Sequence, residues 1–322
     1  MNLFLATNNG LVVAGQTEDG WQSVRRGLEN LHVTSVIARG GVILAGTKNG
    51  VYLSEDEGEN WSWSSNSLTS PHIRWLAYHP QIVDLEFAGT EPASIFYSRD
   101  GAHSWTDCQE VASMRREYHW SLPYSPEAGC VRGFAFLGDR GYAAVEDGAV
   151  LVSNDRGQNW QLAPGSPGGA NHAPQAGQVH SDVHSIAVHP SDADLVLAPT
   201  GGGLYRSTDG GKTWALLYRC YTRAIWLDAN DSQHFIFSPA DSVDRGGRIE
   251  ETHNGGENWQ DANQGLETPW PNTMVERFAQ FGEMLYAVLS DGRLLATPLA
   301  DRQWQPVLAE QAGHTNAVTT MA

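Results

Sequence analysis

Short apolar runs recur along the whole chain, and each run is bounded by glycine, serine, threonine, asparagine or aspartate. One example is the pair Val42–Thr47 and Gly50–Leu53, which are separated by two polar residues. Ile73–Tyr78 and Val131–Phe136 are similar runs that stand earlier in their own units. Apolar runs of this length between turn-forming residues are typical of β-strands. The pattern predicts repeated units of four antiparallel strands.

A polar octet that ends in tryptophan separates the third strand of each unit from the fourth. Clear copies are Ser54–Trp61, Ser153–Trp160 and Ser207–Trp214, whereas Ser98–Trp105 and Thr252–Trp259 are looser. Decayed copies lie near both ends of the chain. The repeat tryptophans are Trp21, Trp61, Trp105, Trp160, Trp214, Trp259 and Trp304. Tryptophans that recur about every 40 to 55 residues indicate the blades of a propeller.

Each residue type in the octet has a physical role. The aspartate side chain can accept hydrogen bonds from the backbone of the turn that follows it. Glycine reaches a backbone geometry that other residues reach only at a cost. The tryptophan begins the fourth strand, and we expect it to pack between neighbouring sheets.

The octet resembles the Asp-box, or BNR repeat, and the resemblance covers nearly the whole chain. This repeat is found in sialidases, xyloglucanases with two propellers, sorting receptors of the VPS10 type and photosystem II assembly factors of the Ycf48 type. The chain is also similar to stand-alone bacterial BNR-repeat proteins, which often carry a sialidase or glycosidase label. The resemblance implies a propeller fold and is weak for function.

The number of repeats predicts an all-β fold with one domain over residues 1–322, a seven-bladed β-propeller of four-stranded antiparallel blades. The chain starts in a second strand at Phe4–Thr7 and ends on Asn316–Thr320, which matches an unpartnered first strand. We therefore expect the C-terminal strand to join the N-terminal blade and close the ring. Such closure removes a free sheet edge.

Composition narrows the possible partners. The formal charge is −17, with 37 acidic against 20 basic residues, which argues against nucleic acid or an anionic membrane as a partner. No apolar stretch is long enough to span a bilayer, and the first residues lack the features of a signal peptide. Three cysteines are a sparse, odd set, which favours a reducing compartment. The expected location is cytoplasmic.

Aligning the first strands of the blades gives one column of residues that should surround the propeller axis. The column reads Thr34, Arg74, Arg132, His184, Arg223, Glu276 and a residue near Ala317. Arginine forms planar, two-pronged hydrogen bonds with carboxylate or phosphate, so three arginines in an acidic protein favour an anionic ligand. The alternative is that each arginine pairs with an acid, for which Glu276, Glu146 and Asp182 are available.

The long connections are expected on the face opposite the Asp-boxes, and they carry residues of catalytic type. His184 or His119 could act as a base and Tyr118 as an acid, with Glu146 and Asp182 nearby. Two aromatic side chains would suit stacking on a sugar. These are Trp120 and Trp270.

A metal site is a further hypothesis. His180, Asp182 and His184 alternate along an extended segment and could face one side, so that a Zn or Mn ion could bind there, with His119 and Glu146 as further ligands. The alternative is a histidine pair that only makes structural hydrogen bonds.

Two functions follow from these patterns. The first is binding, and possibly hydrolase or lyase cleavage, of an acidic carbohydrate or another small anionic ligand in the axial funnel. The second is a non-catalytic scaffold or assembly factor that binds a protein partner, as the Ycf48-type resemblance implies.

Overall fold

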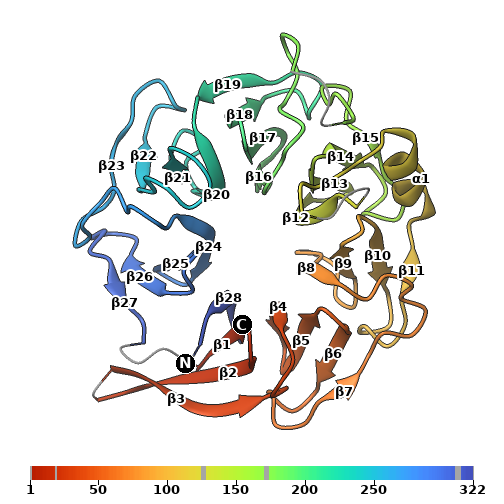
Figure 1. Cartoon of the computed structure of the whole chain (residues 1–322), viewed down its shortest axis with the longest axis vertical. Coiled ribbons are helices and arrows are strands. Elements are labelled where there is room, and N and C mark those ends of the chain that lie inside the picture. Colours follow the sequence, from red (N-terminus) through yellow and green to blue (C-terminus); the bar gives the residue numbers. More distant parts are fainter. Residues whose placement is uncertain (1, 19, 125–127, 170–173, 309–312, 322) are drawn as a thin grey trace.

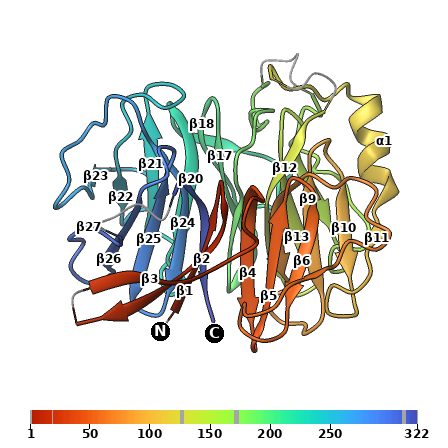
Figure 2. The same ribbon diagram turned by 60° about the horizontal axis from the view of Figure 1, so that its bottom comes forward.

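The computed structural model describes residues 2–18, 20–124, 128–169, 174–308 and 313–321. Seven four-stranded antiparallel sheets surround a central axis, as Figure 1 shows. This arrangement confirms the predicted seven-bladed β-propeller. Figure 2 shows the same ring tilted by 60°, so that the length of the strands in each blade can be seen.

Each blade runs from an inner to an outer strand. The first blade consists of β28 (Thr315–Thr320), β1 (Asn2–Thr7), β2 (Gly10–Thr17) and β3 (Gly20–Gly27). The second consists of β4 (Val33–Arg39), β5 (Val42–Thr47), β6 (Gly50–Ser54) and β7 (Ser62–Trp63). The third consists of β8 (Ile73–Tyr78), β9 (Glu86–Thr90), β10 (Ile95–Ser98) and β11 (Thr106–Asp107). The next two are β12 (Cys130–Leu137), β13 (Arg140–Glu146), β14 (Ala149–Ser153) and β15 (Gln161–Leu162); β16 (Ala187–His189), β17 (Asp192–Thr200), β18 (Gly203–Ser207) and β19 (Ala215–Tyr218). The last two are β20 (Tyr221–Leu227), β21 (Phe235–Ala240), β22 (Glu250–Thr252) and β23 (Gln260–Asp261); β24 (Val275–Phe281), β25 (Met284–Leu289), β26 (Leu294–Pro298) and β27 (Gln305–Pro306).

The C-terminal strand closes the ring as predicted. β28 pairs antiparallel with β1, and Phe4 faces Thr319 in the register. Because the first strand of this blade comes from the far end of the chain, β1 is paired on both sides, with β28 and with β2. Both ends of the chain lie at this blade in Figure 1.

The Asp-box turns close as the sequence predicts. Oδ1 of Asp155 accepts hydrogen bonds from the backbone N–H groups of Gln158 and Asn159, and Ser153 Oγ accepts one from Gly157. Gly157 has a φ of 78°, a left-handed conformation that glycine adopts without strain. These turns all join third to fourth strands, and we call the face that carries them the Asp-box face. The opposite face is the top face.

The apolar core lies between neighbouring blades. Phe87 of β9 stacks on Phe136 of β12 with ring centroids 4.5 Å apart, and both rings are buried. Trp105 Nε1 donates to the carbonyl of Ser64 in the preceding blade, so this repeat tryptophan packs between sheets as expected. Burial of a phenylalanine side chain stabilises a fold by about 1.5–3 kcal/mol, so each interface contributes substantially to the ring.

One predicted loop contains a helix. Residues Gln109–Glu117 form α1, with Glu110 in the first turn and Arg115 and Arg116 in the last. These charges match the helix dipole, and Glu110 also accepts the backbone N–H of Trp160. The helix lies at the outer edge of the ring in Figures 1 and 2. No helix in the described ranges is long and apolar enough to cross a membrane.

Candidate functional site

A β-bulge near the top of every inner strand points side chains at the axis. In five inner strands, one residue has no pairing partner in the second strand of its blade. These residues are Thr34 in β4, Arg74 in β8, Arg132 in β12, Glu276 in β24 and Asn316 in β28. The extra residue in β20 lies at Arg223 or Ala224, and in the fifth blade it lies between Val183 and Ala187. A bulge redirects a side chain out of the regular alternation. The aligned column therefore surrounds the axis, with Asn316 in place of a residue near Ala317.

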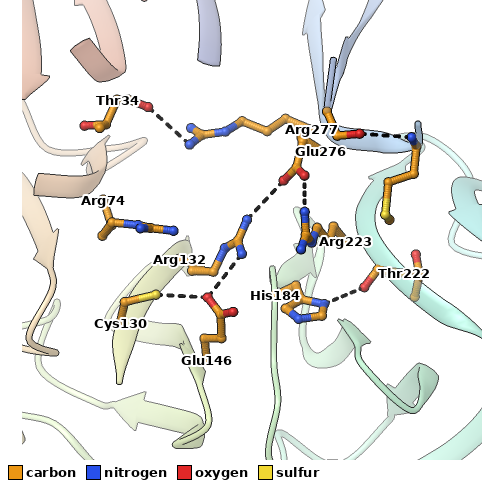
Figure 3. Close-up of polar contacts among 12 residues, drawn as sticks. Thr34, Arg74, Cys130, Arg132, Glu146, His184, Thr222, Arg223, Glu276 and Arg277 are labelled. Atoms are coloured by element: carbon orange, nitrogen blue, oxygen red, sulfur yellow. Dashed lines mark hydrogen bonds and ion pairs between the residues drawn. The ribbon is translucent and has the colours of Figure 1, made fainter. Parts of the chain in front are cut away.

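The column arginines are held by carboxylates. Arg132 bridges two of them, with 3.1 Å from Nη1 to Glu146 Oε2 and 3.1 Å from Nη2 to Glu276 Oε2, and Arg223 binds the other oxygen of Glu276 (Figure 3). Arg74 Nη1 lies 2.8 Å from Glu91 Oε2. Burial alone would raise the pKa of Glu276, but Arg223 and Arg132 hold it below its usual value. The predicted ion pairs are therefore present, although Asp182 is not among the acids that hold these arginines.

One cavity of about 260 Å³ opens beside this network, and we call it the axial pocket. Its side chains are mostly basic or polar and come from the blades near the chain termini. They include His32, Thr34, Lys48, His72, Arg74, Arg132, Glu276, Arg277, Ser290, His314 and Asn316. Glu276 is the single carboxylate among these lining residues, and both of its oxygens already contact arginines.

Arg277 is a cation of the axial pocket that is held by a carbonyl and an aromatic ring. Its Nη2 donates to the carbonyl of Thr34 at 3.2 Å, and its guanidinium lies 4.1 Å from the ring centroid of Trp75. Among the described residues no carboxylate forms an ion pair with it. Burial lowers the pKa of Arg277 to about 9, and Arg132 adds to this effect, while Glu276 opposes it. The pocket therefore holds positive charge that its own acids leave unbalanced.

Two histidines of the pocket have lowered pKa values. Burial lowers the pKa of His32 to about 4, with further contributions from Lys48, His72 and His314. The pKa of His72 is also lowered, first by burial and then by Arg74. Burial is the main cause of both shifts, and the neighbouring cations add to it.

A regularity in the sequence identifies these histidines, although the sequence analysis did not use it. Each stands two residues before a bulged position and forms a second column around the axis. This column reads His32, His72, Cys130, Asp182, Tyr221, Met274 and His314. Lys48, in the turn between β5 and β6, and Arg277, directly after a bulged position, were also missed.

The other side of the axis carries an acidic cluster. Nε2 of His184 lies 2.9 Å from Oδ1 of Asp182 and 3.3 Å from the hydroxyl of Tyr221, and its Nδ1 lies 2.8 Å from the carbonyl of Thr222. Ligand atoms of Glu146, Asp182 and His184 all lie within 4.8 Å of one another. Burial opposes ionisation of Glu146, but Arg132 and His184 lower its pKa to about 2. Three of the predicted catalytic residues therefore converge.

The remaining predicted site residues lie elsewhere. Tyr118 and His119 follow α1 at the outer edge of the ring, so they do not join His184. Trp120 is fully buried and donates its Nε1 to the carbonyl of Gly168, and Trp270 is a core residue with 6% exposure. The prediction that these tryptophans present a face to a sugar is wrong, because both rings are packed inside blades.

The predicted metal ligand His180 is also separate from the cluster. Its ring lies against Gly202 and lines a different surface cavity, and its Nδ1 accepts the backbone N–H of Asp182. Glu146, rather than His180, joins Asp182 and His184. Residues 180–184 form no regular strand, and the two histidines lie against different neighbours.

Comparison with known proteins agrees with the fold. The family model of the BNR/Asp-box repeat matches residues 205–216. Together with the seven blades, this match shows a propeller built on Asp-box repeats, as predicted.

A xyloglucanase of Hypocrea jecorina (strain QM6a) is 24% identical over 195 residues, which are 54% of this chain and 21% of the xyloglucanase. The chain therefore spans about a fifth of that relative. Among solved structures, an ancestral GH74 enzyme has a TM-score of 0.61 at 18% identity, over 98% of this chain and 39% of that one. YCF48 from Cyanidioschyzon merolae has a TM-score of 0.61 at 15% identity, over 93% and 96%. At such identities the structural likeness shows the fold alone.

Proposed function

We propose that the axial pocket binds a small anionic ligand and that an acidic sugar is the class of ligand that fits it. The observation that carries this proposal is the charge of the lining. Lys48, Arg74, Arg132 and Arg277 line a cavity whose one lining carboxylate is already held by two arginines. The whole chain has a formal charge of −17, so this concentration of cations runs against the overall composition.

The side chains divide the work of binding by their chemistry. Figure 3 shows the Arg277 guanidinium reaching Thr34, with the Arg74 guanidinium on the same side of the network. Both line the axial pocket, and although Arg74 is also held by Glu91, a planar guanidinium suits a carboxylate or another planar anion. Lys48 is exposed at the top face and adds a point charge that attracts the anion as it enters. Among the described residues no ion pair holds the Lys48 ammonium, so it is available to a ligand.

The size of the cavity limits the ligand. A volume of about 260 Å³ lies just below the range of typical small-molecule pockets, about 300–1,000 Å³. A single sugar ring with one carboxylate is of suitable size. Thr34, Ser290 and Asn316 add polar groups to the lining that suit sugar hydroxyls.

The similarity to a xyloglucanase and to a GH74 enzyme supports a carbohydrate over other small anions. Binding is better supported than cleavage. The His184 side chain has no exposed surface, and both of its ring nitrogens contact protein atoms, so it does not reach the axial pocket as a base. Cleavage by a glycosidase- or lyase-type reaction stays a prediction.

The scaffold alternative rests on a different similarity. A YCF48 structure bound to a D1 peptide has a TM-score of 0.60 with this chain at 13% identity. A protein partner on a broad top face would not require the cavity or its unbalanced cations. A ligand that enters the cavity as a small molecule therefore distinguishes the two functions.

Isothermal titration calorimetry with glucuronate at pH 7 and low salt tests the proposal. We expect one binding site per chain, with glucose binding far more weakly. The two lysines of the chain, Lys48 and Lys212, offer a matched pair, because both are exposed and Lys212 lies on the Asp-box face. Lys48→Glu should weaken glucuronate binding at least tenfold, and Lys212→Glu should leave it unchanged. Equal binding of glucose and glucuronate, or equal effects of the two substitutions, would argue against the axial pocket.

A further inference from the structure

The acidic cluster has the geometry of a metal site. Ligand atoms of Glu146, Asp182 and His184 lie within 4.8 Å of one another, and Nε2 of His184 is 2.9 Å from Oδ1 of Asp182. Two ligands of one metal ion, each about 2.0–2.2 Å from it, lie roughly 3 Å apart. Asp182 and His184 are therefore spaced as neighbouring ligands of one ion, and Glu146 lies within 4.8 Å of both.

The contacts of the His184 ring match those of a metal-binding histidine. Its Nδ1 lies 2.8 Å from the carbonyl oxygen of Thr222, and a carbonyl can only accept, so Nδ1 is the donor in this contact. Its other ring nitrogen, Nε2, lies 2.9 Å from Oδ1 of Asp182. Metal-binding histidines typically donate their second ring N–H to a carbonyl in this way.

Glu146 is oriented as a ligand by its other oxygen. Its Oε2 accepts from Tyr124 Oη at 3.2 Å, from Cys130 Sγ at 3.1 Å and from Arg132 Nη1 at 3.1 Å. Among the described residues none donates to Oε1. The three donors fix the carboxylate plane and leave one oxygen for a cation, which is the role that partners of a metal ligand have.

The local charge favours a divalent ion. Four carboxylates gather here, those of Glu146, Asp147, Asp182 and Glu276, of which the first three influence one another's ionisation. Two guanidiniums, Arg132 and Arg223, contact members of this group. The carboxylates outnumber these guanidiniums, and a cation between Asp182 and Glu146 would add to the compensation that His184 gives Asp182.

We propose that Glu146, Asp182 and His184 bind a divalent transition-metal ion, Zn²⁺ or Mn²⁺. One imidazole and two carboxylates suit both ions. Glu146 replaces His180 of the predicted set. This site is separate from the proposed anion site, since its three ligands do not line the axial pocket, and Arg132 is the residue that contacts the cluster and lines that pocket.

A second cluster serves as a natural comparison. His234, Glu251 and His253 also lie within 4.8 Å of one another, near the Asp-box face. There Arg302 contacts two of the three side chains, with Nε 3.3 Å from Glu251 Oε2 and Nη2 3.3 Å from His234 Nε2, whereas Arg132 contacts only Glu146 in the first cluster. We therefore expect no metal ion at this cluster.

The test uses the full chain after treatment with a chelator that is then removed. Titration with ZnCl₂ by calorimetry, and with MnCl₂ by electron paramagnetic resonance, should give one site per chain for at least one ion. Asp182→Asn and Glu146→Gln keep the side-chain shape and should each weaken binding more than tenfold. His253→Gln removes a partly exposed ligand of the comparison cluster and should leave binding unchanged. Melting curves establish that each variant is folded.

Failure of both ions to bind below a Kd of about 1 mM would overturn the proposal. So would binding that survives both Asp182→Asn and Glu146→Gln, or binding that is lost in His253→Gln. The metal titration contains no glucuronate, and the glucuronate titration of Lys48→Glu changes no metal ligand. Each of the two sites can therefore fail without the other.

Discussion

Arg277 provides a sensitive test of whether the axial pocket is built for a ligand or for stability. Its pKa is lowered from 12.5 to about 9, mainly by burial. At pH 7 such a shift corresponds to about 5 kcal/mol of unfavourable folding free energy, because the folded protein must keep this group charged. For a basic group whose pKa is lower in the folded state, this penalty is present in full below about pH 9. It then decreases up to about pH 12.5, where the unfolded chain also loses the proton.

Contacts return part of this cost. A hydrogen bond from a charged donor to a carbonyl contributes about 1.5–3 kcal/mol, and stacking of a cation on tryptophan about 0.5–2 kcal/mol. Arg277 makes both, to Thr34 and Trp75. Arg277→Met keeps an apolar stem on the Trp75 ring and removes the charge. We therefore expect the variant to be as stable as the wild type or up to about 2 kcal/mol more stable.

The same substitution should abolish the response to an anion. In differential scanning fluorimetry at pH 7 and low salt, glucuronate should raise the Tm of the wild type but not of Arg277→Met. Without ligand, the Tm of the variant should be unchanged or up to about 3 °C higher. Arg99→Met is the control, because it removes an exposed arginine beside the Asp-box turn of the third blade. If Arg277→Met melts more than about 5 °C below the wild type and still responds to glucuronate, Arg277 is structural and the argument from its pKa is wrong.

Two further predictions concern pH and the repeat. The pKa of His32 is lowered to about 4 and that of His72 is also lowered, so the folded protein resists their protonation and its stability should fall as pH drops from about 6.5 towards 4. Sulfate bound in the axial pocket should reduce this loss of stability. Melting curves with and without sulfate between pH 8 and 4.5 check both effects. An unchanged sulfate effect across this range would contradict the assignment. Asp155→Ala leaves the turn N–H groups of Gln158 and Asn159 without their acceptor and should lower the free energy of unfolding, measured with denaturant, by about 2 kcal/mol. Asp155→Asn should lower it less, because Asn254 accepts the same backbone hydrogen bond in another repeat. Equal losses in both variants would mean that the turn depends on the charge rather than on the hydrogen bonds.

The fold could be predicted because each Asp-box closes through contacts within a few residues. Ser153, Asp155 and Gly157 form their turn locally, so the repeat is visible in the sequence. Ring closure followed from counting strands. The bulged column around the axis could also be aligned, since each inner strand carries the same offset.

The long connections could not be predicted in the same way. Trp120 follows a helix and is buried because its Nε1 reaches Gly168, a contact over 48 positions that no local pattern reveals. Tyr118 and His119 are carried to the outer edge by the same helix. The pocket histidines are different, because His32, His72 and His314 share one offset from the bulges and a second alignment would have found them.

The central claim is that the axial pocket binds a small anion, and a crystal structure with glucuronate tests it most directly. We expect density for one sugar in the axial pocket, with its carboxylate within hydrogen-bonding distance of Arg277 or Arg74 and near Lys48. A structure at saturating glucuronate with an empty axial pocket, or with the sugar bound only elsewhere, would contradict the account.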